Sequence, residues 1–327
     1  MAERQRGASD TDLLARAAWL HFVGGLTQSE VAKRLDVPTT RAHRYIARAQ
    51  NEGLVRIFVD VAATDCVALE ADLMRTYGLA MCRVAMDVPE AGPMPLRTLS
   101  AVGATWLMQV IAARAHPVIG VGIGRTIAAS VEAMGRTSAE GVRFVSLLGG
   151  LTRSGAANPY DVIHRLAQKT GAEAYLMPTP LFADTAADKA VMVGQAALAV
   201  TMGLIKDASL MVLGIGNLDA ENSAPAQMLD ATGELDALRA RGARAEILGQ
   251  FLDGEGRIVP APHDGRVMAL PLEALTGREA VAIAGGAAKT EAIEAALKSG
   301  LLTGLIIDEA TARRLVERRR ARPATAA

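Results

Sequence analysis

The first fifty residues combine short apolar stripes with polar turns, and this pattern predicts three short helices. The first helix is predicted to run from Asp12 to the Gly24-Gly25 pair. The second begins after Thr27, where Glu30 stands three residues further on and completes a capping box. The third runs from Thr39 to Asn51, because its apolar residues recur at the spacing of one helix face.

Two further elements separate these helices from the rest of the chain. Residues 54–61 alternate between apolar and polar side chains, which predicts a short strand that would form the wing of a winged helix-turn-helix. Residues 62–76 predict a connecting helix. We therefore expect a helical domain at 1–61, a linker helix at 62–76 and a larger domain at 77–327.

The larger domain repeats one theme, in which an apolar strand is followed by a glycine-rich turn and an alanine-rich helix. This alternation is typical of a parallel sheet with helices on both faces, so the predicted fold class is α/β with a Rossmann-like second domain. Residues 86–95 and 249–266 are predicted to be loops. The apolar runs predict strands at Met81–Ala85, Val118–Val121, Val142–Leu147, Ala174–Met177, Leu210–Leu213, Val281–Ala284 and Leu305–Ile307.

Composition adds limits to this picture. Half of the 327 residues are hydrophobic but only 3% are aromatic, so small and aliphatic side chains must build the core. The formal net charge is zero, which neither indicates nor excludes a nucleic-acid partner. No apolar run reaches the length of a membrane span, and the N-terminus lacks the apolar stretch of a signal peptide. We therefore expect a cytoplasmic protein with no membrane partner.

The sequence contains no pattern for a metal or catalytic site. Its five histidines lack the spacing of metal ligands, and no G-x-S-x-G motif is present. The two cysteines, Cys66 and Cys82, form no C-x-x-C pair and are expected to be free thiols. We therefore expect no metal, no cofactor and no catalytic residue.

The third predicted helix is basic on the side opposite its apolar stripe. Between Pro38 and Asn51 there are three arginines and no acidic residue. A helix of this kind suits the major groove, because arginine contacts guanine edges or phosphates, and threonine and histidine can do either. The preceding helix would cross the DNA backbone with its first residues facing phosphate. The predicted DNA-binding residues are Gln28, Ser29, Thr39, Thr40, Arg41, His43, Arg44 and Arg48.

The same pattern also fits a plain three-helix bundle with a solvated basic face. Three features favour DNA binding. The tight turn Asp36-Val37-Pro38 falls where the motif requires it, the basic face carries no compensating acid, and a wing-like strand follows. We therefore predict that the chain binds double-stranded DNA through its third helix.

Three glycine-rich turns follow predicted strands of the larger domain, at Gly120–Thr126, Gly214–Asn217 and Gly285–Lys289. Glycine lets backbone N–H groups approach an anion, and a helix N-terminus adds a favourable partial charge. Arg125 and Lys289 supply full positive charge. Such turns gather at the carboxyl ends of strands, where open α/β sheets bind ligands, so they predict a site for a phosphate or phosphorylated sugar. The alternative is that turns of any α/β domain are rich in glycine.

None of these turns matches the dinucleotide motif or the P-loop motif, which disfavours a dinucleotide or a nucleoside triphosphate. Asp253 precedes a glycine-rich run. Its carboxylate could accept sugar hydroxyls, or it could be an ordinary loop residue.

Several segments together resemble the SorC family of bacterial sugar-responsive regulators. They are TQSEVAKRLDVPTTRAHRYI, GVGIGRT, SLLGG, LGIGN and AGGAAKT, which match in order and spacing over nearly the whole chain. The segment RAAWLHFVGGLTQSEVAKRL is similar to the branch of the family that regulates erythritol catabolism. One departure is that the first helix carries Trp19, His21 and Phe22 where many members have paired tyrosines, so DNA contacts of that helix are not transferred.

The resemblance implies a second domain similar to sugar-phosphate isomerases and glucosamine-phosphate deaminases. It also implies a phosphorylated sugar or polyol as the effector and assembly as a homotetramer, a dimer of dimers. Family effector sites correspond to Gly122, Gly124, Arg125, Thr126, Gly149, Gly150, Asp253, Gly286 and Lys289.

The expected function is therefore a repressor or activator whose affinity for a DNA operator changes when the effector binds. The alternative is an enzyme of the isomerase or deaminase type, with Asp253 and Lys289 as base and acid. The N-terminal helix-turn-helix argues against the enzyme, because such enzymes do not need one.

Overall fold

The computed structural model divides into two compact units, Met1–Val59 and Asp60–Ala327. The residues that it describes are 10–52, 54–55, 64–90, 92, 94–151, 162–219 and 223–321. The predicted wing strand at 54–61 lies largely outside these residues.

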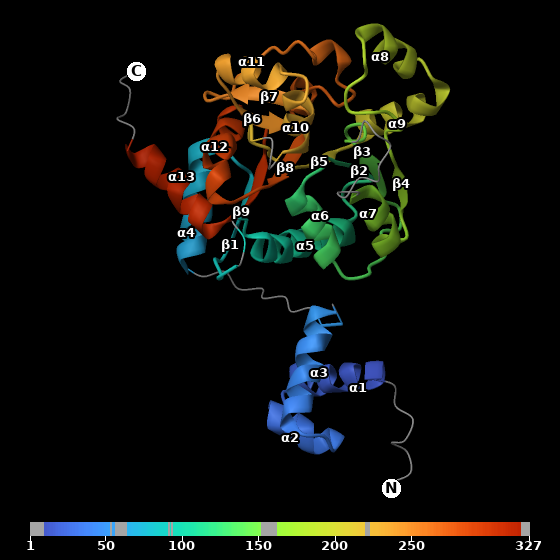
Figure 1. The fold of residues 1–327 in the computed structure, drawn as a ribbon, viewed down its shortest axis with the longest axis vertical. Helices are drawn as coiled ribbons and strands as arrows, with labels where there is room; N and C mark the ends of the chain where they lie inside the picture. The colour runs from blue at the N-terminus through green and yellow to red at the C-terminus, as the bar shows by residue number, and fades with distance from the viewer. Residues whose placement is uncertain are drawn as a thin grey trace. The chain divides into compact units, whose positions relative to one another are not determined.

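The first unit is a bundle of three helices (Figure 1). They are α1 (Asp10–Ala18), which continues as a π-helical turn η1 (Trp19–Val23), then α2 (Gln28–Leu35) and α3 (Thr39–Asn51). The apolar positions that predicted the helices form the core of the unit, since each helix turns its stripe inward. This core contains Leu14, Ala17, Ala18, Val31, Ala32, Ala42, Tyr45, Ile46 and Ala49.

The second unit is built on a parallel sheet of seven strands in the order β1-β9-β8-β5-β2-β3-β4 (Figure 1). The seven strands predicted for this unit are all present. Central strands such as β5 are buried at every residue, because helices cover both faces of the sheet. The strands are β1 (Met81–Ala85), β2 (Val118–Val121), β3 (Arg143–Ser146), β4 (Glu173–Tyr175), β5 (Leu210–Leu213), β8 (Glu279–Ile283) and β9 (Gly304–Asp308).

Two apolar clusters mark the two faces of this sheet. On one face pack α5 (Leu96–Ala113), α6 (Arg125–Ala133) and α7 (Val162–Thr170). The helices on the other face are α4 (Thr64–Tyr77), α9 (Ala196–Asp207), α10 (Ala224–Asp230), α11 (Glu234–Ala240), α12 (Thr290–Lys298) and α13 (Glu309–Ala321). The remaining helix is α8 (Ala186–Val193), and short 3₁₀ turns lie at η2 (Asp264–Arg266), η3 (Leu272–Leu275) and η4 (Ala287–Lys289).

One prediction for this unit is wrong. Residues 249–266 are not a loop throughout, because β7 (Gln250–Asp253) pairs in antiparallel fashion with β6 (Ala243–Ile247). The turn between the two strands places Leu248 at φ 54° and Gly249 at φ 75°. Leucine rarely adopts a positive φ, so the sequence carried no ordinary hairpin signal here.

By length and composition alone, helix α5 is long and apolar enough to cross a membrane. In the structure this helix packs on the sheet, with Leu99, Trp106 and Ile111 buried among other core residues. Its apolar character thus serves the core of the domain.

Candidate functional sites

The turn between α2 and α3 is fixed by caps at both helix ends. Thr27 and Glu30 form the predicted capping box, in which Glu30 Oε2 accepts from the Thr27 N–H at 2.8 Å and Thr27 Oγ1 accepts from the Glu30 N–H at 3.4 Å. Asp36 ends α2 in the left-handed conformation, and the Val37 N–H returns to Ala32 O at 3.0 Å. These bonds give α3 a fixed starting direction, as a helix-turn-helix requires.

The predicted DNA-binding residues lie on the solvent side of this unit. Ser29 is exposed at the start of α2, and Gln28 beside it is half-buried. Along α3 the exposed members are Thr39, Thr40, Arg41, His43 and Arg44. This face is the one opposite the buried stripe, so it is the face of α3 that a groove or a phosphate can reach.

Arg48 corrects the expectation of an uncompensated basic face. Its guanidinium lies 2.7 Å from Asp10 in α1 and 2.9 Å from Glu52, so two carboxylates already pair with it. Arg41 is also engaged, because its Nε donates to Tyr45 Oη at 2.7 Å. Arg48 therefore joins α3 to α1 in this conformation, and Arg44 is the stronger candidate for a DNA contact.

The glycine turns meet at the carboxyl edge of the parallel sheet. From β2 the chain proceeds to β3 and β4 on one side, whereas from β5 it proceeds to β8 and β9 on the other. The order therefore reverses between β2 and β5, and ligands of open α/β sheets bind at such a point. The Gly122 N–H donates to Val212 O at 2.8 Å, and a Cβ on Gly214 would lie 2.7 Å from Ile123 O. The two turns are therefore in contact.

Four glycines of the predicted effector site have backbone N–H groups that already donate within the protein. The pairs are Gly122 to Val212, Gly149 to Met268, Gly150 to Thr179, and Gly286 to both Asp308 and Thr311. In this conformation these N–H groups are already paired with acceptors inside the protein. At Gly149 the missing side chain instead permits close packing, because a Cβ there would overlap the carbonyl of Pro180.

The first turn of α6 retains the capacity to bind an anion. Gly124 is its N-cap and supplies no side-chain cap, and the first N–H groups of any helix have no partner inside it. The helix dipole and the guanidinium of Arg125 add positive charge at this end. Thr126 is buried and its Oγ1 donates to Ile283 O at 2.5 Å, so this side chain joins α6 to β8.

Lys289 brings a second cation to the same edge. Its Nζ donates to Ile215 O at 2.7 Å, in the turn after β5. Burial lowers the pKa of Lys289 to about 8, and the neighbouring charge of Arg125 acts in the same direction while Glu246 opposes it. The structure therefore places Lys289 close enough to Arg125 for the two charges to interact.

Glu246 in β6 is a buried carboxylate that the sequence analysis missed. Its Oε1 accepts from the Gly249 N–H at 2.6 Å, and its backbone pairs with Gly216 at 2.9 Å in both directions. Burial raises the pKa of Glu246 to about 7, although the Gly249 N–H and the charge of Lys289 act to lower it. The available signal was an acid inside the apolar run 245–248, because such residues are seldom fully buried without a partner.

Asp253 holds a turn of its own at the end of β7. Its Oδ1 accepts from the N–H groups of Glu255 and Arg257 at 2.8 and 2.9 Å, which closes the turn after β7. The adjoining Gly254 carbonyl accepts from Lys298 Nζ at 2.9 Å, at the last residue of α12.

Two buried polar atoms beside the glycine turns lack a hydrogen-bond partner among the described residues. They are Asn217 Oδ1 and Thr179 Oγ1. Asn217 follows Gly216 in the chain, and the backbone carbonyl of Thr179 accepts from the Gly150 N–H at 2.7 Å. Buried polar atoms are normally paired. Both atoms are therefore available to hydroxyl groups of a ligand at this edge.

The described part of the chain contains no cluster of three or more His, Cys, Asp or Glu residues placed to hold a metal. Cys66 and Cys82 are free and buried, as expected. Burial raises the pKa of the Cys82 thiol to about 12, so it stays protonated and unreactive.

Comparison with known proteins relates this architecture to bacterial regulators. A family model described as "Putative sugar-binding domain" matches residues 61–317. The erythritol catabolism regulatory protein EryD of Brucella abortus (strain 2308) is 45% identical over 308 residues, which cover 94% of this chain and 97% of that protein. The transcriptional regulator LsrR of Enterobacter sp. (strain 638) is 29% identical over 324 residues, covering 96% of each chain.

A solved structure has the same fold. The full-length sorbitol operon regulator SorC from Klebsiella pneumoniae superimposes with a TM-score of 0.71 at 24% identity, covering 95% of this chain and 100% of that one. The chain is therefore a sugar-binding transcriptional regulator and not an enzyme. It belongs to the SorC family, in the branch of the erythritol regulator.

Proposed function

We propose that this regulator binds a DNA operator through α3 and that a phosphorylated sugar or polyol changes its affinity for that operator. The observation that carries the proposal is the pairing of two cations, Arg125 and Lys289, with the first turn of α6 at the reversal point of the sheet. A helix N-terminus with adjacent cations suits a phosphate group.

The polar atoms around these cations suit the remainder of such a ligand. Glu246 offers a buried carboxylate, and Asn217 Oδ1 and Thr179 Oγ1 offer partners for hydroxyl groups. The name of EryD connects that relative with erythritol, a four-carbon polyol. A tetritol phosphate is therefore the first ligand to test.

The DNA contacts proposed are those of the exposed α3 face, with Arg44 and His43 in the groove and Ser29 near a phosphate. We further propose a cytoplasmic homotetramer, a dimer of dimers, because paired half-sites need paired recognition helices. In this proposal residues 1–61 bind DNA, residues 62–76 form the linker helix, and residues 77–327 bind the effector and assemble the oligomer.

A thermal-shift titration of the full chain tests the effector. The ligands are tetritol phosphate, the unphosphorylated tetritol and inorganic phosphate. A ligand at 100 times its Kd stabilises the folded state by about 2.7 kcal/mol. We expect this shift with tetritol phosphate and its loss in Lys289→Met. An equal shift in that variant, or a shift with tetritol alone, would contradict the phosphate site.

A mobility-shift assay on operator DNA then measures the regulatory response and its sign. Lys289→Met should bind the operator as the wild type does but fail to respond to the effector, since Lys289 lies in the second unit. An effector that lowers operator affinity identifies a repressor, and one that raises it identifies an activator. Turnover of the ligand in the same mixture would contradict a pure regulator.

A further inference from the structure

Asp308 and Thr311 form a buried polar node between the turn after β8 and helix α13. Asp308 is the last residue of β9, and Thr311 lies in the first turn of α13. The Gly286 N–H donates to Asp308 Oδ2 at 2.9 Å and to Thr311 Oγ1 at 3.0 Å. Asp308 Oδ1 in turn accepts from the Thr311 N–H at 3.0 Å and from the Thr311 hydroxyl at 2.9 Å. The node therefore fixes the start of α13 to the turn that carries Lys289.

This turn is packed too closely against the node to move independently of it. A Cβ on Gly285 would overlap Asp308 Oδ2, and Gly286 has a φ of 99°, a conformation that favours glycine. The Lys289 N–H donates to Gly286 O at 2.9 Å and closes the turn. A phosphate at Lys289 Nζ competes with Ile215 O, which accepts from this ammonium at 2.7 Å. A ligand that shifts Lys289 therefore acts on Gly286 and on the node.

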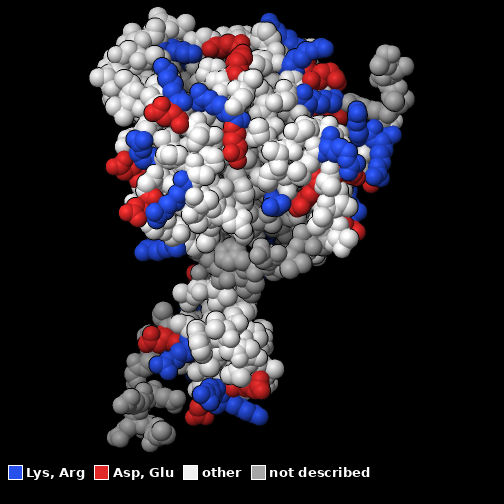
Figure 2. Space-filling model, turned by 180° about the vertical axis from the view of Figure 1, so that it is seen from behind, with Lys and Arg blue, Asp and Glu red and all other residues white. Residues whose placement is uncertain are grey.

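Helix α13 extends from the node along α4, and the two helices are in contact (Figure 1). Arg313 lies 3.1 Å from Asp65, and Arg320 lies 3.5 Å from Asp72. Seven positions separate the two arginines and seven separate the two acids, which is about two helical turns, so the helices run parallel with matched faces. In the rear view of Figure 2, Lys and Arg side chains gather over α13 at the right edge.

Buried apolar packing holds this helix pair together. Exposed ion pairs contribute little free energy, so the two arginine–aspartate pairs mainly set the register of the helices. The residues of α4 and α13 that share one apolar cluster are Cys66, Leu69, Leu73, Ala312 and Leu315. The first unit ends at Val59 and α4 begins at Thr64, so a displacement of α4 acts directly on the chain segment that joins the two units.

We propose that Asp308 and Thr311 are positioning residues that couple the effector turn to α4 through α13. The inference rests on the proposed effector site, and it names the route by which that site changes operator affinity. An effector shifts an equilibrium only when it binds one conformation better than another. The node connects the two conformations of the turn with two positions of α13, and α13 determines the position of α4.

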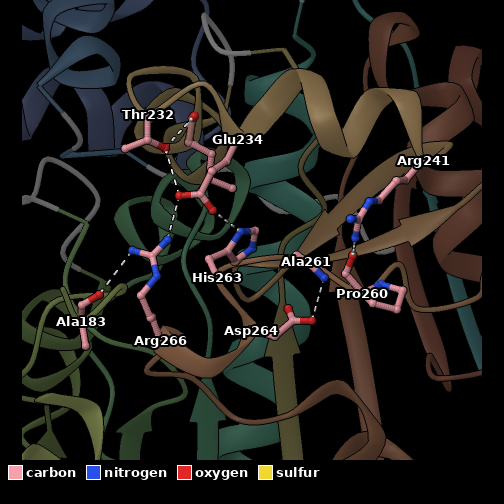
Figure 3. Close-up of polar contacts among 10 residues, drawn as sticks. Ala183, Thr232, Glu234, Arg241, Pro260, Ala261, His263, Asp264 and Arg266 are labelled. Carbon is pink, nitrogen blue, oxygen red and sulfur yellow. Dashed lines mark hydrogen bonds and ion pairs between the residues drawn. The ribbon is translucent and has the colours of Figure 1, made fainter. Parts of the chain in front are cut away.

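A second polar cluster of the same unit offers a competing route. Glu234 accepts from Arg266 Nη2 at 2.7 Å and lies 3.2 Å from His263 Nδ1, and Arg266 Nη1 donates to Ala183 O at 3.5 Å (Figure 3). These contacts connect α11 with η2 and with the chain before α8. The node at Asp308 leads instead to α4, which adjoins the DNA-binding unit in the chain, so connectivity favours the node.

Anisotropy of labelled operator DNA, with and without tetritol phosphate, tests this coupling in the full chain. Effectors commonly change the affinity for a second ligand by about 5–150-fold. Thr311→Val removes the hydroxyl between Gly286 and Asp308, so we expect it to reduce the change in operator affinity to less than about twofold. Effector affinity, measured by calorimetry, should stay near the wild-type value, because Thr311 does not face the ligand.

Two control variants separate coupling from stability. Thr311→Ser keeps the hydroxyl and should respond to the effector as the wild type does. Thr170→Val removes a buried hydroxyl of α7 that donates to Leu166 O at 2.6 Å, on the other face of the sheet. It should lose stability as Thr311→Val does and keep the full response. A loss of response in Thr170→Val equal to that in Thr311→Val would contradict a specific role of the node.

The remaining outcomes distinguish this inference from the proposed function. A wild type that does not bind tetritol phosphate contradicts the proposed function and the coupling with it. A wild type that responds, together with a folded Thr311→Val that responds equally, overturns the coupling alone. A response lost in Arg266→Gln but kept in Thr311→Val also overturns it and assigns the coupling to the cluster of Figure 3.

Amide hydrogen exchange of the wild type tests the same route without a variant. Binding of tetritol phosphate should change the protection of α13 and α4 together with that of the turn at 285–289. Helix α7 packs on the opposite face of the sheet and should keep its protection. A change confined to the turn, with α4 and α13 unaltered, would show that the node does not transmit effector binding.

Discussion

Lys289 and Glu246 bring opposite charges to the same partly enclosed edge of the sheet, where their pKa values lie at about 8 and about 7. Burial acts on both groups and disfavours the charged form of each, while their mutual attraction opposes this effect. Both groups therefore change protonation between about pH 7 and pH 8.

The first prediction is that affinity for a phosphorylated effector falls as pH rises from 6.5 to 8.5. At the lower pH Lys289 is charged and Glu246 is mostly neutral, whereas at the higher pH Glu246 is charged and Lys289 is losing its proton. The phosphate is already mostly a dianion at about pH 6.5, because its second pKa is about 6, so it gains little charge over this range. The expected loss is about tenfold, since hydrogen bonds to charged groups contribute about 1.5–3 kcal/mol.

Isothermal titration with tetritol phosphate at several pH values measures this dependence. In Glu246→Gln, Lys289 is the one member of this pair that still titrates. The dependence of effector affinity on pH should therefore lose its component near pH 7. A flat profile in the wild type would show that Lys289 does not contact the phosphate.

The second prediction concerns Gly216, which lies against Glu246. An added Cβ would overlap Glu246 Oε2 and lie 3.1 Å from Ser223 Oγ. Gly216→Ala should therefore displace the carboxylate, lower stability by about 1–3 kcal/mol and weaken effector binding. Gly254→Ala is the control, because the nearest atom to its Cβ is Arg244 Cγ at 3.8 Å. Equal chemical-denaturation midpoints and effector affinities for the two variants would contradict the close approach at Gly216.

The third prediction separates the arginines of α3. Arg44 is exposed, and no ion pair or hydrogen bond of its side chain is found among the described residues. Arg44→Ala should weaken operator binding by about 1–3 kcal/mol if it contacts a base, with no change in the melting temperature. Arg48→Ala loses contacts with Asp10 and Glu52, so it should lower the melting temperature of the helical unit slightly.

Mobility-shift titrations at fixed salt and differential scanning calorimetry provide the two measurements. Arg75→Ala, on the exposed side of α4 in the second unit, controls for the loss of one positive charge. If Arg44→Ala and Arg75→Ala bind the operator equally, Arg44 is not in the interface.

The sequence alone predicted those structural features that a single local physical rule determines. Strands such as β2 and β5 are buried on both faces, so they appear as uninterrupted apolar runs bounded by glycine. The capping box of Thr27 and Glu30 is a local interaction, and its spacing alone specifies it. These features needed no information about distant parts of the chain.

The candidate site depended on contacts that only the folded chain creates. Gly149, Gly150 and Gly286 carry the right residue type, but tertiary partners already accept their N–H groups. Glu246 reaches the site through the β6–β7 hairpin, whose Leu-Gly turn lacks a usual sequence signature. Arg48 is paired by Asp10, which lies 38 positions away in the sequence. Local patterns cannot specify such partners.

The fourth prediction concerns the buried imidazole of His263, which packs edge-on against Phe182 and Phe251. Its Nδ1 lies 3.2 Å from Glu234, and its Nε2 has no partner among the described residues. Burial lowers the pKa of His263 below its ordinary value of 6.5, although Glu234 opposes the shift. The native protein therefore binds fewer protons than the unfolded chain, so stability is complete above about pH 6.5 and is lost as pH falls.

The expected slope is at most about 1.4 kcal/mol per pH unit below pH 6.5, since a single proton is involved. Urea unfolding between pH 7.5 and 5.5, monitored by the circular dichroism of the second unit, measures it. His263→Gln keeps a donor for Glu234 but cannot be protonated, so it should flatten the dependence over this range. An unchanged slope in His263→Gln would assign the acid sensitivity to another group.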